Sequence, residues 1–532
     1  MYMAGQQNSL ESNFKEGSKI VLYFLLSFSI IAFTGCTEKF LEVDPPDGLN
    51  QENFYKTEEQ MISALVSAYD VMHWPEFYGR DYFLILDVAS DDCKGEYPGW
   101  TFDNFSFSNS DLRIYHLWEI FYRGIFRCNT VLERIPESLP EKFVKQVKAE
   151  AKFLRAFYYW HVVTVFGQAP LLLNVLAPDE LAQPKVTQEK IWTQIEKDLI
   201  EAIPDLPLRS EYNSSQFGRA TQGAAQALLG KSYLYQQKYD LAKLQFESVI
   251  NSNQYQLIQA VQKDSLSYYN AFLSIFTEEP FGGYGGQDVL LGGENNIESL
   301  FEVQFFDYES FNQWLGWGNA GSERAQYLNS QIISGYRNMV PDVSLVNSFH
   351  PSDPRLAASV WRSGDTLDFR PGTKLYNVQF VPFTDSMKDF SGMAIYTGYL
   401  IKKTVYPLWY KGYLYGNNYP IIRYADVLLM YAEVLYHLRQ GDPYEYINLV
   451  RNRVGLPPTN QSLPNAFIQE RRWELCFENQ RFNDLIRWTK CGCISNVQNY
   501  IPEFTSGKNE YFPIPQTEIE MSEGALIQNP NY

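Results

Sequence analysis

Two glutamates in the C-terminal part of the chain have the spacing of a catalytic carboxylate pair. Glu474 and Glu478 lie four residues apart in a stretch with helical periodicity, so they are expected to share one helical face with Cβ atoms roughly 5–6 Å apart. The two carboxyl groups of a retaining glycosidase are about 5–5.5 Å apart. However, Arg471, Arg472 and Arg481 lie within reach. A neighbouring arginine lowers a carboxyl pKa, whereas a general acid needs a raised one. We therefore predict structural ion pairs and no catalytic residue.

Histidine and cysteine spacing adds no further chemistry. The five histidines show no metal-ligand spacing to another histidine, a cysteine or a carboxylate, and the glycine run 282–286 lacks the context of a phosphate loop. Cys491 and Cys493 are too close for a comfortable disulfide and lack the second pair of a zinc motif. The sequence therefore predicts no metal and no cofactor, with most cysteines as small buried groups.

Aromatic residues in polar, glycine-rich segments are better candidates, because they suit binding. A sugar ring has apolar C–H faces and hydroxyl groups, so a receptor combines flat aromatic platforms with amide or carboxylate partners. The predicted ligand-binding residues of this kind are Tyr97, Trp100, Asp103, Asn104, Tyr284, Trp314, Trp317 and Asn319, with Asp91 and Asp92 as hydrogen-bonding partners. The alternatives are core aromatics that pin their loops and, for Asp91 and Asp92, solvated turn residues.

Bulk composition agrees with a binding protein. Aromatic residues make up 16% of the chain, with 38 Tyr, 36 Phe and 11 Trp, and Tyr and Trp suit binding surfaces. The formal net charge of −18 argues against nucleic acid as a partner, because affinity for phosphates comes from Lys and Arg.

The N-terminus has the order of an export signal. Lys15 and Lys19 precede an apolar run from Ile20 to Phe33, which at 14 residues is too short for a membrane-spanning helix of roughly 20. Phe33-Thr34-Gly35 then leads into Cys36. This pattern resembles a bacterial lipobox, although Phe33 stands where leucine is usual. We predict a signal peptide over 1–35 and a lipid anchor on Cys36; the alternative is ordinary secretion with a coincidental cysteine.

Helical segments would position the binding loops. Apolar spacing predicts helices over 114–132, 141–166, 188–202, 423–454 (as a pair) and 463–489, and an irregular, partly exposed segment over 74–110. The spacing Leu229-Gly230-x2-Tyr233, then Ala242 and Phe246, matches a tetratricopeptide repeat. Gly230 and Ala242 would let two antiparallel helices approach closely. The expected fold is mainly α, a scaffold of tetratricopeptide-like helix pairs with a loop-rich, minor-β binding face.

Motifs along nearly the whole chain are similar to those of the SusD/RagB family of Bacteroidetes outer-membrane lipoproteins. These motifs are Cys36 with Phe40-Leu41 and Asp44-Pro45-Pro46, Asn53-Phe54-Tyr55, 149–156 (AEAKFLRA), Phe166-Gly167, 423–433 (RYADVLLMYAE), 448–453 (NLVRNR), 470–478 (ERRWELCFE), Arg487-Trp488, 511–515 (YFPIP) and 528–532 (QNPNY). The resemblance implies one body over 36–532, with a helical scaffold and first binding loop over 36–265 and a C-terminal region over 266–532. It also implies a sugar-stacking aromatic near Trp100.

The resemblance implies a function and leaves the ligand open. Members of the family are not enzymes; they sit on the cell surface, anchored by lipid, as a lid over a SusC-like TonB-dependent outer-membrane transporter. They capture oligosaccharides or, in the RagB branch, peptides. The third hypothesis, after oligosaccharide binding and peptide binding, is a lipid-anchored tetratricopeptide scaffold that binds only proteins.

Overall fold

The computed structural model describes residues 54–95, 101–277, 292–305, 322–324, 338–362, 399–404 and 416–532, with the backbone of 387–388 and 394–395. The chain divides into two units, Met1–Tyr55 and Lys56–Tyr532, and the described helices and strands lie in the second. The longer helices are α2 (Glu58–Asp70), α3 (Asp81–Val88), α4 (Leu112–Arg134), α5 (Glu141–Val165), α6 (Gln188–Ala202), α7 (Gln222–Tyr235), α8 (Tyr239–Asn251), α9 (Ser265–Leu273), α13 (Tyr424–Leu438), α14 (Pro443–Arg453), α15 (Asn465–Leu475) and α16 (Arg481–Lys490). The shorter helices are α11 (Val343–Ser348), α12 (Pro354–Ser359) and α17 (Gln516–Met521).

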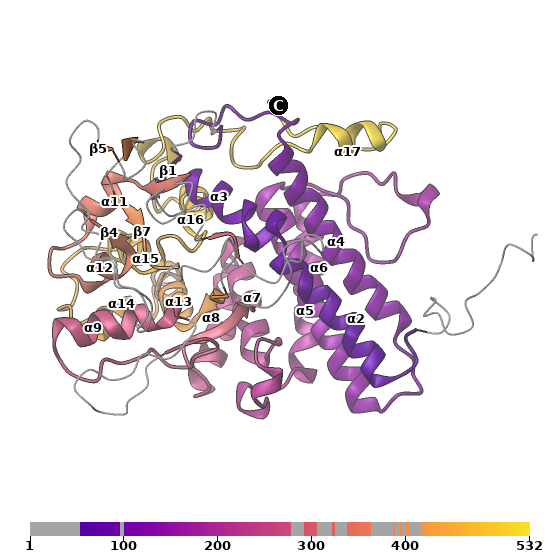
Figure 1. The fold of residues 1–532 in the computed structure, drawn as a ribbon, viewed down its shortest axis with the longest axis horizontal. Coiled ribbons are helices and arrows are strands. Elements are labelled where there is room, and N and C mark those ends of the chain that lie inside the picture. The colour runs from indigo at the N-terminus through magenta and orange to yellow at the C-terminus, as the bar shows by residue number, and fades with distance from the viewer. Residues whose placement is uncertain are drawn as a thin grey trace, which may run out of the picture. The chain divides into compact units, whose positions relative to one another are not determined.

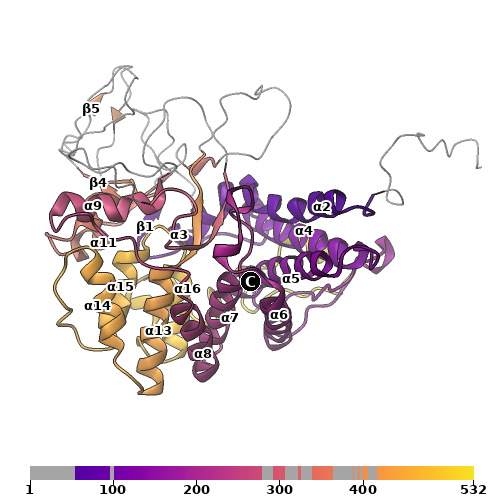
Figure 2. The same cartoon turned by 90° about the horizontal axis from the view of Figure 1, so that it is seen from below.

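Successive helices pack side by side in one continuous row, which confirms the expected helix-pair architecture. The order of contact runs from α4 through α5, α6, α7 and α8 to α13 and α14, although about 170 residues separate α8 from α13 in the chain. Figures 1 and 2 show this row from two sides. Among the described residues, no helix is long and apolar enough to span a membrane.

The α7–α8 pair has the packing that the repeat pattern predicts. Phe246 and Ala242 of α8 are fully buried, and Tyr233 of α7 is 5% exposed. A Cβ atom added to Gly230 would lie 2.6 Å from Cε1 of Phe246, far inside van der Waals contact. Glycine at 230 is therefore what lets the Phe246 ring lie against the α7 backbone.

Several predicted boundaries hold, and two segments differ. Helices α4, α5 and α6 match the expected ranges closely. The segment after Trp74 is less irregular than predicted, because Pro75–Gly79 forms a π-helical turn and every residue of α3 is buried. An apolar helix without a polar face gives no periodic signal in the sequence. The expected helix over 463–489 is instead two helices, separated at 476–480.

The strands are short and pair in antiparallel twos, in keeping with the minor-β expectation. The pairs are β1 (Cys93–Gly95) with β3 (Met339–Pro341), β2 (Ser299–Val303) with β8 (Tyr419–Arg423), β4 (Val360–Trp361) with β7 (Leu400–Ile401), and β5 (Met387–Lys388) with β6 (Ala394–Ile395). In register, Cys93 faces Pro341, Ser299 faces Arg423 and Val360 faces Ile401. Each of these three pairs joins segments distant in the chain.

A network of buried charges joins the C-terminal helices to these strands. Glu474 of α15 accepts hydrogen bonds from Arg423 at 2.7 Å, from Arg355 at 3.0 Å and from Arg453. Arg423 and Arg453 also donate to Glu298, at 2.8 and 3.1 Å. All five side chains are at most 1% exposed. Because an unpaired charge at this depth is costly, the network requires α12, α14, α15, β8 and the start of β2 to be placed together.

This network corrects the predicted geometry of the carboxylate pair. Helix α15 ends at Leu475, and Phe477 adopts a left-handed conformation with φ of +64°, so Glu474 and Glu478 do not share a helical face. The arginines that pair with Glu474 come from other elements, not from positions 471, 472 or 481. Burial alone would raise the pKa of Glu474, but Arg453 and Arg423 outweigh it and hold the pKa well below the ordinary value.

The close approach at Gly230 predicts that alanine at this position destabilises the protein, the opposite of its usual effect in a helix. Glycine to alanine in an exposed helix stabilises by about 1 kcal/mol. Here we expect Gly230→Ala to lower the free energy of unfolding by about 1–3 kcal/mol, because the added methyl overpacks against Phe246. Urea denaturation followed by circular dichroism measures it. In the Phe246→Leu background the cost of Gly230→Ala should shrink by about 1 kcal/mol; equal costs in both backgrounds would refute the clash.

The buried network predicts that Glu474→Gln is strongly destabilising. The amide keeps the shape but leaves Arg423 and Arg453 with too little negative charge, at an expected cost of about 3–5 kcal/mol in urea denaturation. The matched control is Glu503→Gln at an exposed position, where the change should be within about 0.5 kcal/mol. A folded, equally stable Glu474→Gln protein that had lost the release of reducing ends from a glycan would instead support the hydrolase reading.

Candidate ligand-binding face

The structure describes four of the predicted ligand-binding residues: Asp91, Asp92, Asp103 and Asn104. The others lie outside the described residues, as does the predicted lipidation site; they are Cys36, Tyr97, Trp100, Tyr284, Trp314, Trp317 and Asn319. The described residues therefore show how the segments carrying most of the predicted aromatics are held at their ends.

Asp91 and Asp92 are buried in ion pairs. Asp91 accepts two hydrogen bonds from Arg481, at 2.7 and 2.9 Å, and Asp92 accepts one from Arg472 at 2.7 Å. The alternative of solvated turn residues is wrong, since the two side chains are 8% and 1% exposed. Burial raises the pKa of Asp92, whereas Arg481 holds that of Asp91 below its usual value against the effect of burial. Both carboxylates hold this segment against α15 and α16, and their contact with a ligand stays a prediction.

Asp103 and Asn104 lie nearer the surface, beside the predicted Trp100 loop. Lys94 Nζ lies 3.3 Å from Asp103 Oδ1, so an ion pair joins residues on the two sides of the segment that contains Trp100. Burial raises the pKa of Asp103, although the positive charge of Lys94 opposes the shift. Asn104 is exposed, and its Oδ1 accepts hydrogen bonds from the backbone and the hydroxyl of Ser106. Both side chains are at the surface where a ligand can reach them, but their binding role is untested.

Strand pairing anchors the Trp100 segment to the rest of the body. Strand β1, which ends at Gly95 just before that segment, is paired with β3. The backbone N–H of Asp342 also donates to the carbonyl of Asp92 at 2.8 Å. The start of the Trp100 segment is thus fixed beside residues almost 250 positions later in the chain.

A buried polar cluster anchors the end of β2 to the start of β8. Asn418 accepts from the backbone N–H of Phe305 at 2.8 Å and donates to Glu302 at 3.1 Å. Glu302 also accepts from the backbone N–H of Asn295 at 3.0 Å, and burial raises its pKa. These contacts fix Phe305, which directly precedes the segment with Trp314 and Trp317.

A close backbone contact holds the segment that contains Tyr284 at both ends. The backbone N–H of Gly293 donates to the carbonyl of Ser274 at 2.8 Å. Gly292 has a φ of +65°, and a Cβ there would lie 2.2 Å from the same carbonyl oxygen, so only glycine fits. Strand pairing and hydrogen bonds therefore fix the described frame where the predicted binding segments leave it, an arrangement suited to carrying binding loops.

The buried histidine His161 has a structural role. His161 Nδ1 donates to the carbonyl of Phe157 at 2.9 Å, and Nε2 accepts from the hydroxyl of Tyr78 at 2.9 Å. Burial lowers the pKa of His161 to about 3, so the ring is neutral at physiological pH. With both ring nitrogens bonded inside the core, His161 is not placed to act on a bound ligand.

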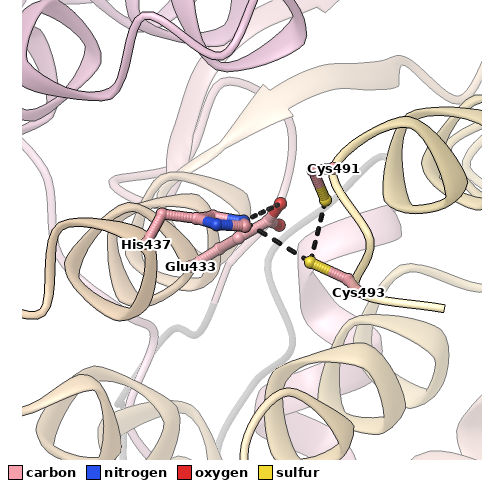
Figure 3. Close-up of side chains that lie close together, drawn as sticks. All are labelled: Glu433, His437, Cys491 and Cys493. Atoms are coloured by element: carbon pink, nitrogen blue, oxygen red, sulfur yellow. Dashed lines mark hydrogen bonds and ion pairs between the residues drawn. The ribbon is translucent and has the colours of Figure 1, made fainter.

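One cluster of metal-ligating side chains was missed by the sequence reasoning. Glu433, His437, Cys491 and Cys493 place donor atoms within 4.8 Å of one another (Figure 3). The statement that no histidine has metal spacing to a carboxylate is therefore wrong, because Glu433 and His437 lie one helical turn apart on α13. The spacing of Glu433 and His437 and the Cys-x-Cys pair were both visible in the sequence. The sequence did not show that α13 contacts the turn after α16, which brings the two pairs together.

Comparisons with known proteins agree with this fold. A family model described as SusD family matches residues 298–532, and one described as starch-binding associating with outer membrane matches 39–234. Starch-binding protein SusD of Bacteroides thetaiotaomicron is 29% identical over 86% of this chain and 86% of that protein. A laminarin binding SusD-like protein has a TM-score of 0.69 at 28% identity, covering 90% of this chain and 100% of that one. Surface glycan-binding protein A from Bacteroides thetaiotaomicron, in complex with laminarihexaose, has a TM-score of 0.69 at 25% identity, with the same coverage. The chain belongs to the SusD family.

Proposed function

We propose that this protein is a cell-surface lipoprotein that binds an oligosaccharide or polysaccharide and delivers it to a SusC-like TonB-dependent transporter in the outer membrane. Its action is capture and transfer, without cleavage of the ligand. The observation that carries the proposal is the match, in sequence and in fold over nine-tenths of the chain, to proteins described as binding laminarin and laminarihexaose. A relative described as starch-binding supports the same ligand class.

The arrangement of the described residues supports binding through loops. The segments that contain Trp100 and Trp317 adjoin strand pairs and buried polar contacts, so their ends cost little further ordering when a ligand binds. Flat aromatic side chains add contact area with few rotatable bonds to immobilise. Sugars are the ligands whose apolar faces and hydroxyls use both the aromatics and neighbours such as Asp103 and Asn104.

Transfer to a transporter follows from the family resemblance and from the predicted anchor at Cys36. A bacterial lipoprotein cysteine carries three acyl chains, and two or more give stable attachment at about 0.8 kcal/mol per buried methylene. Attachment to the same membrane would keep the binding body close to a transporter and raise its effective concentration there.

The proposed stacking predicts that Trp100→Ala and Trp317→Ala weaken glycan binding. Loss of a stacked aromatic anchor costs about 2 kcal/mol or more, so the dissociation constant should rise by at least about tenfold. Affinity electrophoresis and calorimetry against a polysaccharide panel that includes laminarin and starch measure this. The matched control is Trp192→Ala, a half-buried tryptophan on α6, which should leave binding unchanged.

Binding assays, mass spectrometry and copurification together separate the remaining hypotheses about the ligand. Binding that survives both Trp100→Ala and Trp317→Ala would contradict the site assignment but keep the ligand class. No binding to any polysaccharide, with peptides found by mass spectrometry in the purified protein, would support the peptide-binding reading of the RagB branch. A transporter or other protein that copurifies without any small ligand would support the protein-binding scaffold.

The lipid anchor predicts that Cys36→Ala releases the protein from the membrane. Without the thiol no acyl chain can be attached, and the body over 56–532 has no membrane-spanning helix among its described residues. Fractionation of the producing cells should move the protein from the membrane pellet to the supernatant. Cys128→Ala, which removes a buried thiol of α4, should leave the protein in the pellet. A Cys36→Ala protein that remains in the pellet would contradict lipidation at this position.

A further inference from the structure

Four side chains from two separate elements form a compact cluster at the end of α13. Glu433 and His437 lie on one face of α13, and Cys491 and Cys493 lie in the turn directly after α16. One donor atom from each residue falls within 4.8 Å of all the others. Figure 3 shows the four side chains lying close together, two from α13 and two from the turn after α16. This cluster lies outside the segments that carry the predicted ligand-binding aromatics.

The turn after α16 brings both thiols to the same side. Helix α16 ends at Lys490, and the backbone N–H of Cys493 returns to the carbonyl of Trp488 at 2.8 Å. Gly492, between the two cysteines, has a φ of +75°, which glycine adopts without strain. This conformation lets Cys491 and Cys493 act as one chelating pair.

The spacing of the two sulfur atoms lies between that of a disulfide and that of two thiolates on one ion. The two Sγ atoms are 2.8 Å apart, whereas a disulfide bond is about 2.05 Å long. With zinc–sulfur bonds of about 2.3 Å, two thiolates on a tetrahedral ion stand about 3.8 Å apart. A rotation that parts the thiols by roughly 1 Å would therefore accommodate zinc.

The histidine and the glutamate complete a four-donor set. His437 Nε2 lies 3.4 Å from Cys493 Sγ and 3.9 Å from Glu433 Oε1, both near the spacing of about 3.3–3.6 Å between ligands on one zinc ion. The ring of Tyr239 from α8 stacks on the imidazole, with centroids 4.2 Å apart and planes at 10°. This stacking orients the imidazole, as outer contacts do for metal-ligating histidines.

A divalent cation would offset most of the negative charge of this cluster. Two thiolates and one carboxylate would carry three negative charges, of which a divalent ion neutralises two; Arg487 donates to Glu433 Oε1 and is shared with Asp484, to which it donates at 2.8 Å. The indole N–H of Trp488 donates to the other carboxylate oxygen at 3.1 Å, which further fixes the position of the Glu433 carboxylate. The site is partly enclosed, with side-chain exposures of 1% at Glu433 and 12% at His437.

We propose that Cys491, Cys493, His437 and Glu433 bind one Zn²⁺ ion. Two sulfurs, one imidazole nitrogen and one carboxylate oxygen form a donor set that zinc prefers, with tetrahedral geometry. Because all four positions are taken by protein, the ion would be structural: it ties the turn after α16 to the end of α13. It would act as a clamp within the scaffold and not as a catalyst.

Zinc content of the purified protein tests this site. The full chain is reduced, dialysed against Zn²⁺, passed over a chelating resin and analysed by plasma mass spectrometry; we expect about one zinc per chain. Cys491→Ser/Cys493→Ser should lower this content at least tenfold, and His437→Ala should lower it clearly. The matched controls are Cys128→Ala and His350→Ala, a buried thiol and an exposed histidine elsewhere, which should keep the wild-type content.

Two further readouts guard against loss through misfolding. Co²⁺ in place of zinc should give tetrahedral visible bands with thiolate charge transfer, which vanish in the double cysteine variant while its circular dichroism stays native. Zinc should raise the Tm of the wild type and of both controls, but not of the double variant. The proposal is overturned if the reduced wild type retains no zinc, or if the double variant retains as much. It is equally overturned if intact mass shows an oxidised Cys491–Cys493 pair that takes up no zinc after reduction.

Discussion

The pairing of buried arginines with buried carboxylates is the constraint on which the rest of the structure depends. Arg423 by itself pairs with three carboxylates, Glu298, Glu474 and Glu478, and all four side chains are at most 4% exposed. Such charges gain little over apolar residues in free energy, but a missing partner is very costly. The network therefore selects one arrangement of strand β8 and helix α15 over alternatives of similar packing. Because Arg423 ends β8, the same arrangement sets β2 beside it, and with β2 the start of one predicted binding segment.

This constraint also explains why the carboxylates that resemble a catalytic pair are unsuited to general-acid catalysis. A general acid needs a raised pKa and access to a ligand. Glu474 has neither, since it is fully buried and Arg453 and Arg423 keep it ionised. Asp91 and Asp92 are likewise bonded to arginines of α15 and α16. Carboxylates that sequence spacing places near a binding segment are used to attach that segment to the scaffold.

The sequence predicted what depends on neighbours in the chain. Helices α4 and α6 have regular apolar periodicity, and the Gly230–Phe246 contact lies within one helix pair, so both could be predicted from local sequence. The break at 476–480 could not, because tertiary contacts stabilise its left-handed backbone: Asn479 donates from its N–H to Asp87, almost 400 residues earlier. The partners of the buried arginines and the Glu433–Cys493 cluster could not be predicted for the same reason. They join residues that only the complete fold brings together.

A rigid scaffold and a variable ligand can be selected independently in such a design. The free energy of unfolding rests on helix packing and buried ion pairs, whereas recognition would rest on side chains of segments that leave the scaffold at fixed points such as Gly95 and Phe305. Substitution within a segment then changes the ligand without disturbing the network around Arg423. Relatives at 25–29% identity can keep this fold while their described ligands differ, as starch and laminarin do. The physical consequence is that the fold identifies the family, whereas under the proposed function the ligand is set by the side chains of these segments.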